Sequence, residues 1–266
     1  MNVFERFHEV EAIMLIQDRH KKIIDFVNEK KTVTNQQLLD LLFISEATLR
    51  RDLTELDSKG LISRTHGGAT AREASNMESS ILIRSQKNVK EKKAIAQKCV
   101  EFIKHHDAIF IDSSSTVGYA LPLLSELRDL TFITNGINNA LVLSNTQMRF
   151  SLHITPGIFN SNTNSVLGID TVNYIKNYHC NVSIFSCGGI SPYGITEANH
   201  EQSIVKRELL KRSKLHILLV DHTKFDQIYM SQTCDFDDID IIITDQQPSN
   251  EYVELFKLND CKLVVV

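Results

Sequence analysis

Two adjacent arginines, Arg50 and Arg51, follow Thr48 in a stretch that has a helical pattern. Two guanidiniums beside a hydroxyl suit phosphate oxygens and guanine edges in a DNA major groove. Ser45 lies where it would cap the start of this helix, and the first-turn amides of such a helix can also hold a phosphate. These residue types and their spacing therefore predict contacts with double-stranded DNA.

A second set of polar residues follows apolar runs that are typical of strands. These runs are followed by Asp112, Ser113, Ser114, Ser115 and Thr116, by Asn135 and Gly136, by Gly188 and Gly189, and by Lys224. Ligands of a parallel sheet bind beyond the carboxyl ends of its strands. We therefore expect these residues to form one ligand site.

The chemistry of this second set favours a phosphate. Hydroxyls and free amides at a helix start, as at residues 113–116, make a phosphate cradle. Gly188 and Gly189 permit a ligand to approach the backbone closely, and Lys224 adds a positive charge. Asp112 would repel a phosphate at close range, so we assign it to orienting the loop or to a sugar hydroxyl.

The first sixty residues predict three helices. Helical patterns cover residues 19–30, 35–42 and 46–58, with Thr34 and Ser45 as N-caps and Gly60 as the final stop. Only Phe43 and Ile44 separate the second helix from the third, which is the spacing of a helix-turn-helix. Leu49, Leu53 and Leu56 share the face of the third helix that turns toward the others, and Arg51 lies nearly opposite.

Residues 61–68 predict a β-wing after these helices. A short strand is followed by a pair of glycines, with Arg64 and His66 near the tip. Such side chains contact the DNA backbone or the minor groove.

The rest of the chain alternates between strand and helix patterns. Strands are expected at residues 108–111, 130–134, 150–154, 182–186, 215–220, 239–244 and 262–266, and helices at 90–105, 137–144, 171–178 and 200–212. This alternation predicts an α/β fold with a mostly parallel sheet.

The polar stretch that precedes this α/β region reads as a linker. We therefore place a DNA-binding domain at 1–72, a linker at 73–86 and a ligand-binding domain at 87–266.

Composition limits the class of protein. The chain has 266 residues, 42% of them hydrophobic and 23% charged, with a net charge of −4. These values are typical of a globular protein, and no apolar run approaches the roughly 20 residues of a membrane span. The N-terminus lacks an apolar signal stretch, so we expect a cytoplasmic protein. Six cations lie between residues 84 and 98, which we interpret as a solvated helix face.

The five cysteines are scattered and contain no CxxC pattern. Most of them are therefore interpreted as small buried hydrophobes, and the pattern argues against a disulfide framework or a zinc site. No metal or other cofactor is expected.

The run from Ser45 to Leu53, with Arg64-Thr65-His66-Gly67-Gly68-Ala69 after it, closely resembles the N-terminal signature of the DeoR family of bacterial transcription regulators. This resemblance covers residues 19–69 and places Thr48, Arg50 and Arg51 on the family's recognition helix. Residues 87–245 resemble the family's C-terminal sensor domain, which is related to ribose-phosphate isomerase and CoA-transferase folds. The resemblance implies a phosphorylated sugar or a related metabolite as effector.

Together these features predict a regulator rather than an enzyme. We expect a repressor of a sugar-catabolism operon, controlled by a phosphorylated sugar and acting as a homodimer or homotetramer on operator DNA, with activation left open. One alternative is a sugar-phosphate-metabolising enzyme with a helical accessory domain, for which Asp112, Glu197, Glu201 and Asp221 offer carboxylates. Another is a helical protein-interaction module. Residues 1–13 are interpreted as an upstream extension or a misplaced start.

Overall fold

The computed structural model describes residues 16–58, 61–71 and 80–266. The chain divides into two compact units, with the division between Ser75 and Asn76. The interpretation of residues 1–13 and the stop at Gly60 fall outside the described residues. No helix in the described ranges combines the length and the apolar character that crossing a membrane requires.

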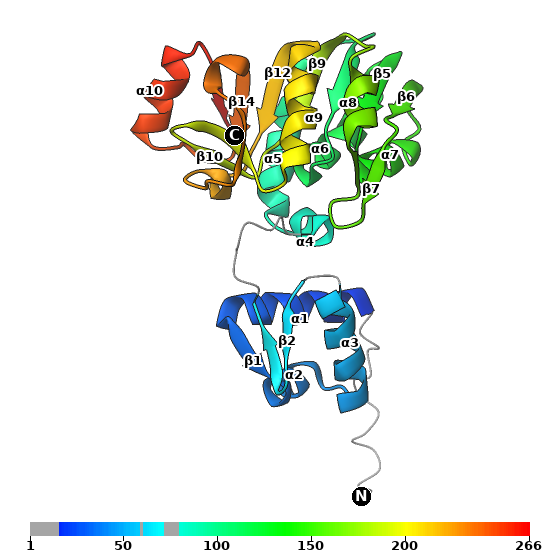
Figure 1. Ribbon diagram of the computed structural model, residues 1–266, viewed down its shortest axis with the longest axis vertical. Coiled ribbons are helices and arrows are strands. Elements are labelled where there is room, and N and C mark those ends of the chain that lie inside the picture. Colours follow the sequence, from blue (N-terminus) through cyan, green and yellow to red (C-terminus); the bar gives the residue numbers. More distant parts are fainter. Residues whose placement is uncertain (1–15, 59–60, 72–79) are drawn as a thin grey trace, which may run out of the picture. The chain divides into compact units, whose positions relative to one another are not determined.

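The first unit packs three helices with a three-stranded antiparallel sheet (Figure 1). Its elements are α1 (Ile16–Lys30), β1 (Thr32–Thr34), α2 (Asn35–Leu42), α3 (Glu46–Ser58), β2 (Ser63–Thr65) and β3 (Gly68–Thr70). β3 lies between β1 and β2 and pairs with both. The hairpin of β2 and β3 is the predicted wing, and β1 adds a strand that the sequence analysis did not anticipate.

Local hydrogen bonds explain where the second helix begins and ends. The hydroxyl of Thr34 accepts the N–H of Gln37 at 3.2 Å, and the Gln37 side chain accepts the N–H of Thr34 at 2.8 Å. This capping box satisfies two amides that would otherwise lack partners at the helix start. After α2, Phe43 adopts a φ of 53°, and its N–H donates to the carbonyl of Leu39 at 2.9 Å. The predicted cap and helix-turn-helix are confirmed.

The second unit is built on a seven-stranded sheet in which every pair of neighbours is parallel. Its order is β15 (Lys262–Val265), β14 (Ile241–Thr244), β12 (Ser213–Leu219), β9 (Cys180–Phe185), β4 (Ala108–Ile111), β5 (Leu130–Thr134) and β6 (Phe150–Ile154). All seven predicted strands are present and form this single sheet, so the predicted α/β fold is confirmed.

Helices cover both faces of this sheet. The helices of this unit are α4 (Ile81–Gln86), α5 (Val89–Cys99), α6 (Ser115–Ala120), α7 (Ile137–Ser144), α8 (Ile169–Ile175), α9 (His200–Lys211) and α10 (Asn250–Leu258), with 3-10 turns at Val100–Phe102, Leu121–Glu126, His222–Lys224 and Phe236–Asp238. On β4, Ile109 and Ile111 join the apolar cluster under α5, α6 and α7, whereas Phe110 joins the cluster under α8 and α9. Figure 1 shows α8 and α9 side by side across one face.

Two smaller sheets complete the second unit. β10 (Gly189–Ser191), β11 (Gly194–Glu197) and β13 (Ser231–Cys234) form an antiparallel sheet, and β7 (Ile158–Asn160) pairs with β8 (Ser165–Leu167). These five short strands were not predicted; of them, β10 and β11 contain glycine. Residues 81–86, placed in the linker from sequence, form α4, and the N–H of Ile81 donates to the carbonyl of Asn162 at 2.9 Å. This part of the predicted linker therefore packs on the second unit.

All five cysteines are free and buried, as predicted. Burial raises the pKa of Cys99, Cys180, Cys187 and Cys261 to about 12, because a thiolate loses its hydration in an apolar setting. The pKa of Cys234 is also raised well above its usual value by burial. These side chains serve as packing groups.

The glycine at position 68 is required by a close approach between β3 and β1. A Cβ on Gly68 would lie 1.9 Å from the carbonyl oxygen of Val33, whereas a Cβ on the neighbouring Gly67 would meet nothing within 4 Å. Replacing Gly68 with alanine should therefore destabilise the first unit by about 1–3 kcal/mol, as overpacking typically does. Thermal unfolding of the full chain measures this, with Gly67→Ala as the matched control. Equal melting temperatures for the two variants would contradict the close packing.

Candidate functional sites

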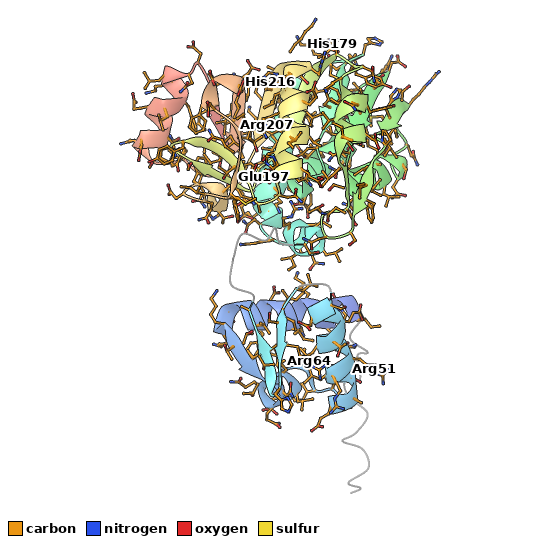
Figure 2. The ribbon with its side chains drawn as sticks, viewed as in Figure 1. Arg51, Arg64, His179, Glu197, Arg207 and His216 are labelled. Carbon is orange, nitrogen blue, oxygen red and sulfur yellow. The ribbon has the colours of Figure 1, made fainter. Side chains whose placement is uncertain are left out.

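The third helix presents two different faces. Leu49, Leu53 and Leu56 are buried against the rest of the first unit, while Arg50 and Arg51 are exposed. Figure 2 shows Arg51 on α3 and Arg64 on the neighbouring wing. The exposed face of α3 thus carries the two guanidiniums, as the helical phase predicted.

The start of α3 is held by hydroxyl groups. The side chain of Ser45 accepts the N–H of Thr48 at 3.2 Å, and the two hydroxyl oxygens lie 2.9 Å apart. Ser45 is exposed and Thr48 is half-buried. The predicted cap at Ser45 is confirmed, and it places both hydroxyls beside the first turn of the exposed helix.

The wing is attached to the second half of α3. The N–H of Arg64 donates to the carboxylate of Asp57 at 3.1 Å, and its guanidinium donates to the hydroxyl of Thr54 at 2.9 Å. The Thr54 hydroxyl in turn donates to the carbonyl of Arg50 at 2.8 Å. Arg64 therefore lies along α3, whereas His66 is exposed in the turn of the wing. Together they extend the polar surface of α3.

A buried carboxylate holds α3 against α1. Asp52 on α3 accepts two hydrogen bonds from the guanidinium of Arg19, at 2.5 and 2.9 Å, and lies 3.2 Å from the ring of His20. Burial alone would raise the pKa of Asp52, but the bonds and charges of Arg19 and His20 outweigh it, so the pKa is lowered. This contact fixes the orientation of the exposed face opposite.

In the second unit, Asp112 ties the loop after β4 to its neighbours. One oxygen of Asp112 accepts the N–H of Ser114 at 2.9 Å, and the other accepts the N–H of Ser186 at 3.1 Å. Lys206 of α9 lies 3.2 Å from the second oxygen. Asp112 is 1% exposed. Of its two expected roles, orienting the loop is the one that these contacts support.

Lys206 and Glu197 are site residues that the sequence analysis did not select together. The ammonium of Lys206 pairs with Glu197 as well as with Asp112, and it donates to the carbonyl of Ser186 at 2.7 Å. Burial would lower the pKa of Lys206, but the charges of Glu197 and Asp112 raise it by more. The pKa therefore lies above its usual value, and the lysine is charged. Glu197 is labelled in Figure 2. Their spacing of nine residues, across a strand and a helix, gave no periodic signal.

The hydroxyl groups of residues 113–116 are buried, and most of them take part in hydrogen bonds within the protein. Gln202 donates to the hydroxyl of Ser113 at 3.3 Å, and the hydroxyl of Ser114 accepts the N–H of Val117 at 3.5 Å, where it caps α6. Ser115 lies 3.2 Å from the ammonium of Lys92. Ser113, Ser114, Ser115 and Thr116 are each less than a tenth exposed. The loop is therefore held in one conformation by its own contacts.

The end of the next strand lies against this loop. A Cβ on Gly136 would lie 2.7 Å from the Cα of Ser113, so the two segments are in contact. The amide nitrogen of Asn135 donates to the carbonyl of Val166 at 3.2 Å. The amide oxygens of Asn135, Asn139 and Gln202 are buried and have no hydrogen-bond partner among the described residues. Buried acceptors without partners are costly, so they are candidates for ligand contacts.

At Gly189, the backbone of the protein itself occupies the space in which we expected a ligand. A Cβ on Gly189 would lie 2.3 Å from the carbonyl oxygen of Gln227, so this glycine admits the chain rather than a ligand. The neighbouring Gly188 is half-buried, and its carbonyl accepts the ammonium of Lys224 at 3.4 Å. The structure therefore brings Gly188 and Lys224 together and closes the space at Gly189.

Lys92 is a third cation near this loop, after Lys206 and Lys224, and the sequence analysis did not select it. Lys92 is 4% exposed, and it donates to Ser115 and to the carbonyl of Arg84. Its pKa is lowered to about 8 by burial and by the charges of nearby cations, including Lys224, although Asp221 acts in the opposite direction. The interpretation of residues 84–98 as a solvated face is wrong at this position, because Lys92 lies on the buried side of α5.

Comparison with known proteins covers both units. The family model described as the DeoR-like helix-turn-helix domain matches residues 19–75, and that of the DeoR C terminal sensor domain matches residues 87–246. The HTH-type transcriptional repressor GlcR of Bacillus subtilis is 31% identical, over 95% of this chain and 97% of its own length. The glycerol-3-phosphate regulon repressor of Escherichia coli is 29% identical, over 86% of this chain and 91% of its own.

Among solved structures, a D-ribose-5-phosphate isomerase in complex with phospho-erythronic acid aligns with 52% of this chain and 54% of its own. The TM-score of this alignment is 0.38 and the sequence identity is 17%.

The pairing of Asp52 with Arg19 predicts how the first unit responds to pH. The pKa of Asp52 is lower in the folded chain than in the unfolded chain, where it is about 3.9. The charged carboxylate therefore stabilises the fold fully above the unfolded pKa, and this stabilisation is lost as the pH falls through the lower pKa of the folded chain. Asp52→Asn should cost about 3 kcal/mol at neutral pH, because Arg19 is left without its charged partner.

Hydrogen exchange of residues 16–58 in the full chain, at pH 7 and at lower pH, measures this stability. Asp25→Asn on the exposed side of α1 is the matched control. The variant at Asp52 should also show a weaker loss of stability on acidification than the unaltered chain. An Asp52→Asn chain that exchanges like the control would show that the pair contributes nothing.

Proposed function

Because the chain belongs to the DeoR family of transcriptional regulators, we propose that it represses a sugar-catabolism operon and that a phosphorylated sugar bound to the second unit controls this repression. Membership of the family makes the chain a DNA-binding regulator, which disfavours the alternative of a sugar-phosphate-metabolising enzyme. The names of the two relatives support repression as the direction of control.

The observation that carries the DNA-binding role is the exposed face of α3. Arg50 and Arg51 project from it, and the hydroxyls of Ser45 and Thr48 flank its first turn. We assign the two guanidiniums to guanine edges and phosphates in the major groove, and the hydroxyls to the phosphate backbone. The charge of Asp52 on the opposite side is neutralised by Arg19, so it does not oppose the approach of DNA.

The wing supplies further contacts in this proposal. Arg64 is bonded to Thr54 along α3, so its charge adds to the backbone-binding surface of that helix. His66 is exposed in the turn and is placed to contact the backbone or the minor groove. A single helix-turn-helix makes few contacts, so tight specific binding favours a homodimer or homotetramer on paired half-sites.

The effector site is proposed at the carboxyl ends of four adjacent strands. β12, β9, β4 and β5 are neighbours in the parallel sheet, so the residues that follow them share one edge. The residues at that edge are the loop 112–116, Asn135, Gly136, Gly188 and Lys224. A phosphate would be bound by hydroxyls and by the charge of Lys224, with Asp112 holding the loop.

The sugar part of the effector is inferred from unsatisfied acceptors. The buried amide oxygens of Asn135 and Gln202 have no partner among the residues described, and sugar hydroxyls are donors that would satisfy them. Gln202 donates to Ser113 through its nitrogen, so its oxygen lies beside the loop proposed for the phosphate. The site thus combines anion binding with acceptors for hydroxyl groups.

Arg51→Ala tests the proposed DNA contact. Loss of one guanidinium that reads a base or phosphate should weaken operator binding by about 1–3 kcal/mol, or roughly fivefold to 150-fold, with no change in melting temperature. Fluorescence anisotropy with the upstream region of the neighbouring operon, at fixed salt, measures the affinity. Arg128→Ala, an exposed arginine of the second unit, is the control. Unchanged affinity of the Arg51 variant would place the DNA-binding face elsewhere.

Lys224→Met tests the proposed effector site. Removing the charge should raise the sugar-phosphate concentration needed for half-maximal release of operator DNA by roughly tenfold, since hydrogen bonds to charged groups contribute about 1.5–3 kcal/mol. Affinity for the operator without effector should not change. The measurement is operator release titrated with a panel of sugar phosphates, with the exposed Lys214→Met as control. A normal response of the Lys224 variant would contradict this site.

A further inference from the structure

The outer face of the helices α8 and α9 carries exposed apolar side chains. Ile169, the first residue of α8, is 67% exposed, and Ile204 on α9 is 36% exposed. Ile158 on β7 is 74% exposed and lies beside the start of α8, since a Cβ on Gly168 would be 3.9 Å from its Cδ1 atom. Apolar side chains that gather on a surface in this way mark an interaction site. We call this surface, which comprises Ile158 and the exposed residues of α8 and α9, the α8–α9 face.

The two helices lie side by side and run in the same direction. They are neighbours on one face of the sheet (Figure 1). α8 leads into β9 and α9 leads into β12, and these two strands pair in parallel. The N-terminal ends of both helices therefore lie at the carboxyl edge of the sheet, and their C-terminal ends lie at the opposite edge.

Charges of opposite sign lie at the two ends of the α8–α9 face. Asp170 and Glu201 are exposed in the first turns of α8 and α9. Lys176 is exposed at the end of α8, and Lys211 is exposed at the end of α9. Arg207, labelled on α9 in Figure 2, is half-buried and adds a cation to the second half of that helix. The face is therefore acidic at one end and basic at the other.

This layout is complementary to itself. A two-fold axis through the middle of the face, near the exposed Asn173, would set the acidic end of one copy against the basic end of the other. Such an isologous contact uses the same surface twice and closes after two copies. A parallel arrangement of two copies would instead set like charges against each other, which is unfavourable.

The helix dipole explains the charges but leaves the isoleucines unexplained. Acids at the start of a helix and bases at its end stabilise that helix by offsetting its dipole. Exposed isoleucines gain nothing from the dipole, and they lose contact with water only if another surface covers them. The apolar side chains thus call for a partner, and the arrangement of charges fits a partner with the same surface.

We propose that two copies of this chain pair through the α8–α9 face. The proposal says where the copies meet in the homodimer or homotetramer of the proposed function, and it rests on that function for the need to pair. Asp170 and Glu201 of each copy face the basic ends of α8 and α9 in the other copy. Ile158, Ile169 and Ile204 are removed from water between the two copies.

Two charge variants of the full chain test this surface by sedimentation equilibrium. One carries Asp170→Lys and Glu201→Lys, so that both ends of the face are basic, and the other carries Lys176→Glu and Lys211→Glu, so that both ends are acidic. Each variant alone sets like charges together, which should raise the dissociation constant between copies by roughly a hundredfold. An equal mixture of the two should pair again, because opposite charges then meet.

Two further variants complete the design. Ile158→Ser with Ile169→Ser should raise the dissociation constant by roughly tenfold, since apolar area is no longer removed from water. Lys90→Glu with Lys93→Glu, on the exposed side of α5 across the sheet, is the matched control and should pair like the unaltered chain. All the altered residues are exposed, and thermal unfolding verifies that each variant folds.

The outcomes separate this surface from the proposed function. If the unaltered chain is a tetramer, the charge variants should sediment as dimers. Charge variants that keep the full assembly would refute the α8–α9 face while leaving the pairing of copies in place, and so would a control that dissociates equally. Charge variants that dissociate but do not pair on mixing would show that the face meets something other than itself. An unaltered chain that is a monomer at concentrations that saturate the operator would refute both the surface and the proposed homo-oligomer.

Discussion

The ion pair between Lys206 and Asp112 is the contact on which the rest of the proposed effector site depends. Burying two charges is costly unless their remaining hydrogen-bonding positions are filled, and here they are filled by the amides of Ser114 and Ser186 and by Glu197. The pair therefore joins β4, β9 and α9 at the edge where four strands end. Because the loop is already ordered by these contacts, a ligand loses little of its binding energy to ordering it.

Much of this fold is encoded in local patterns. The seven strands were predicted because short apolar runs, bounded by polar turns, alternate with helical segments, and a parallel sheet buried on both faces requires such runs. The helix-turn-helix was predicted because Thr34 and Ser45 are good caps and Leu49 and Leu53 define the buried face of α3. The small antiparallel strands depend on contacts with distant segments, such as that of Gly189 with Gln227, which have no local signature.

The residues missed at the site were missed for two different reasons. Lys92 was grouped with its charged neighbours by counting charges, although its spacing from Ile95, Ala96 and Cys99 places it on the buried side of α5. Attention to helical phase would have found it. The partnership of Lys206 with Asp112 joins residues far apart in sequence, so only the three-dimensional structure reveals it. The exposed Arg50 and Arg51 of α3 were predicted because helical phase within a single helix separates them from the buried leucines.

The five buried thiols have a consequence for how the protein responds to its surroundings. Oxidants and electrophiles react with the thiolate, and a thiol with a pKa of about 12 provides almost none of it at physiological pH. None of the five is paired in a disulfide. Peroxide and disulfide reagents therefore meet almost no thiolate on the folded chain, so its cysteines are poor sites of oxidation.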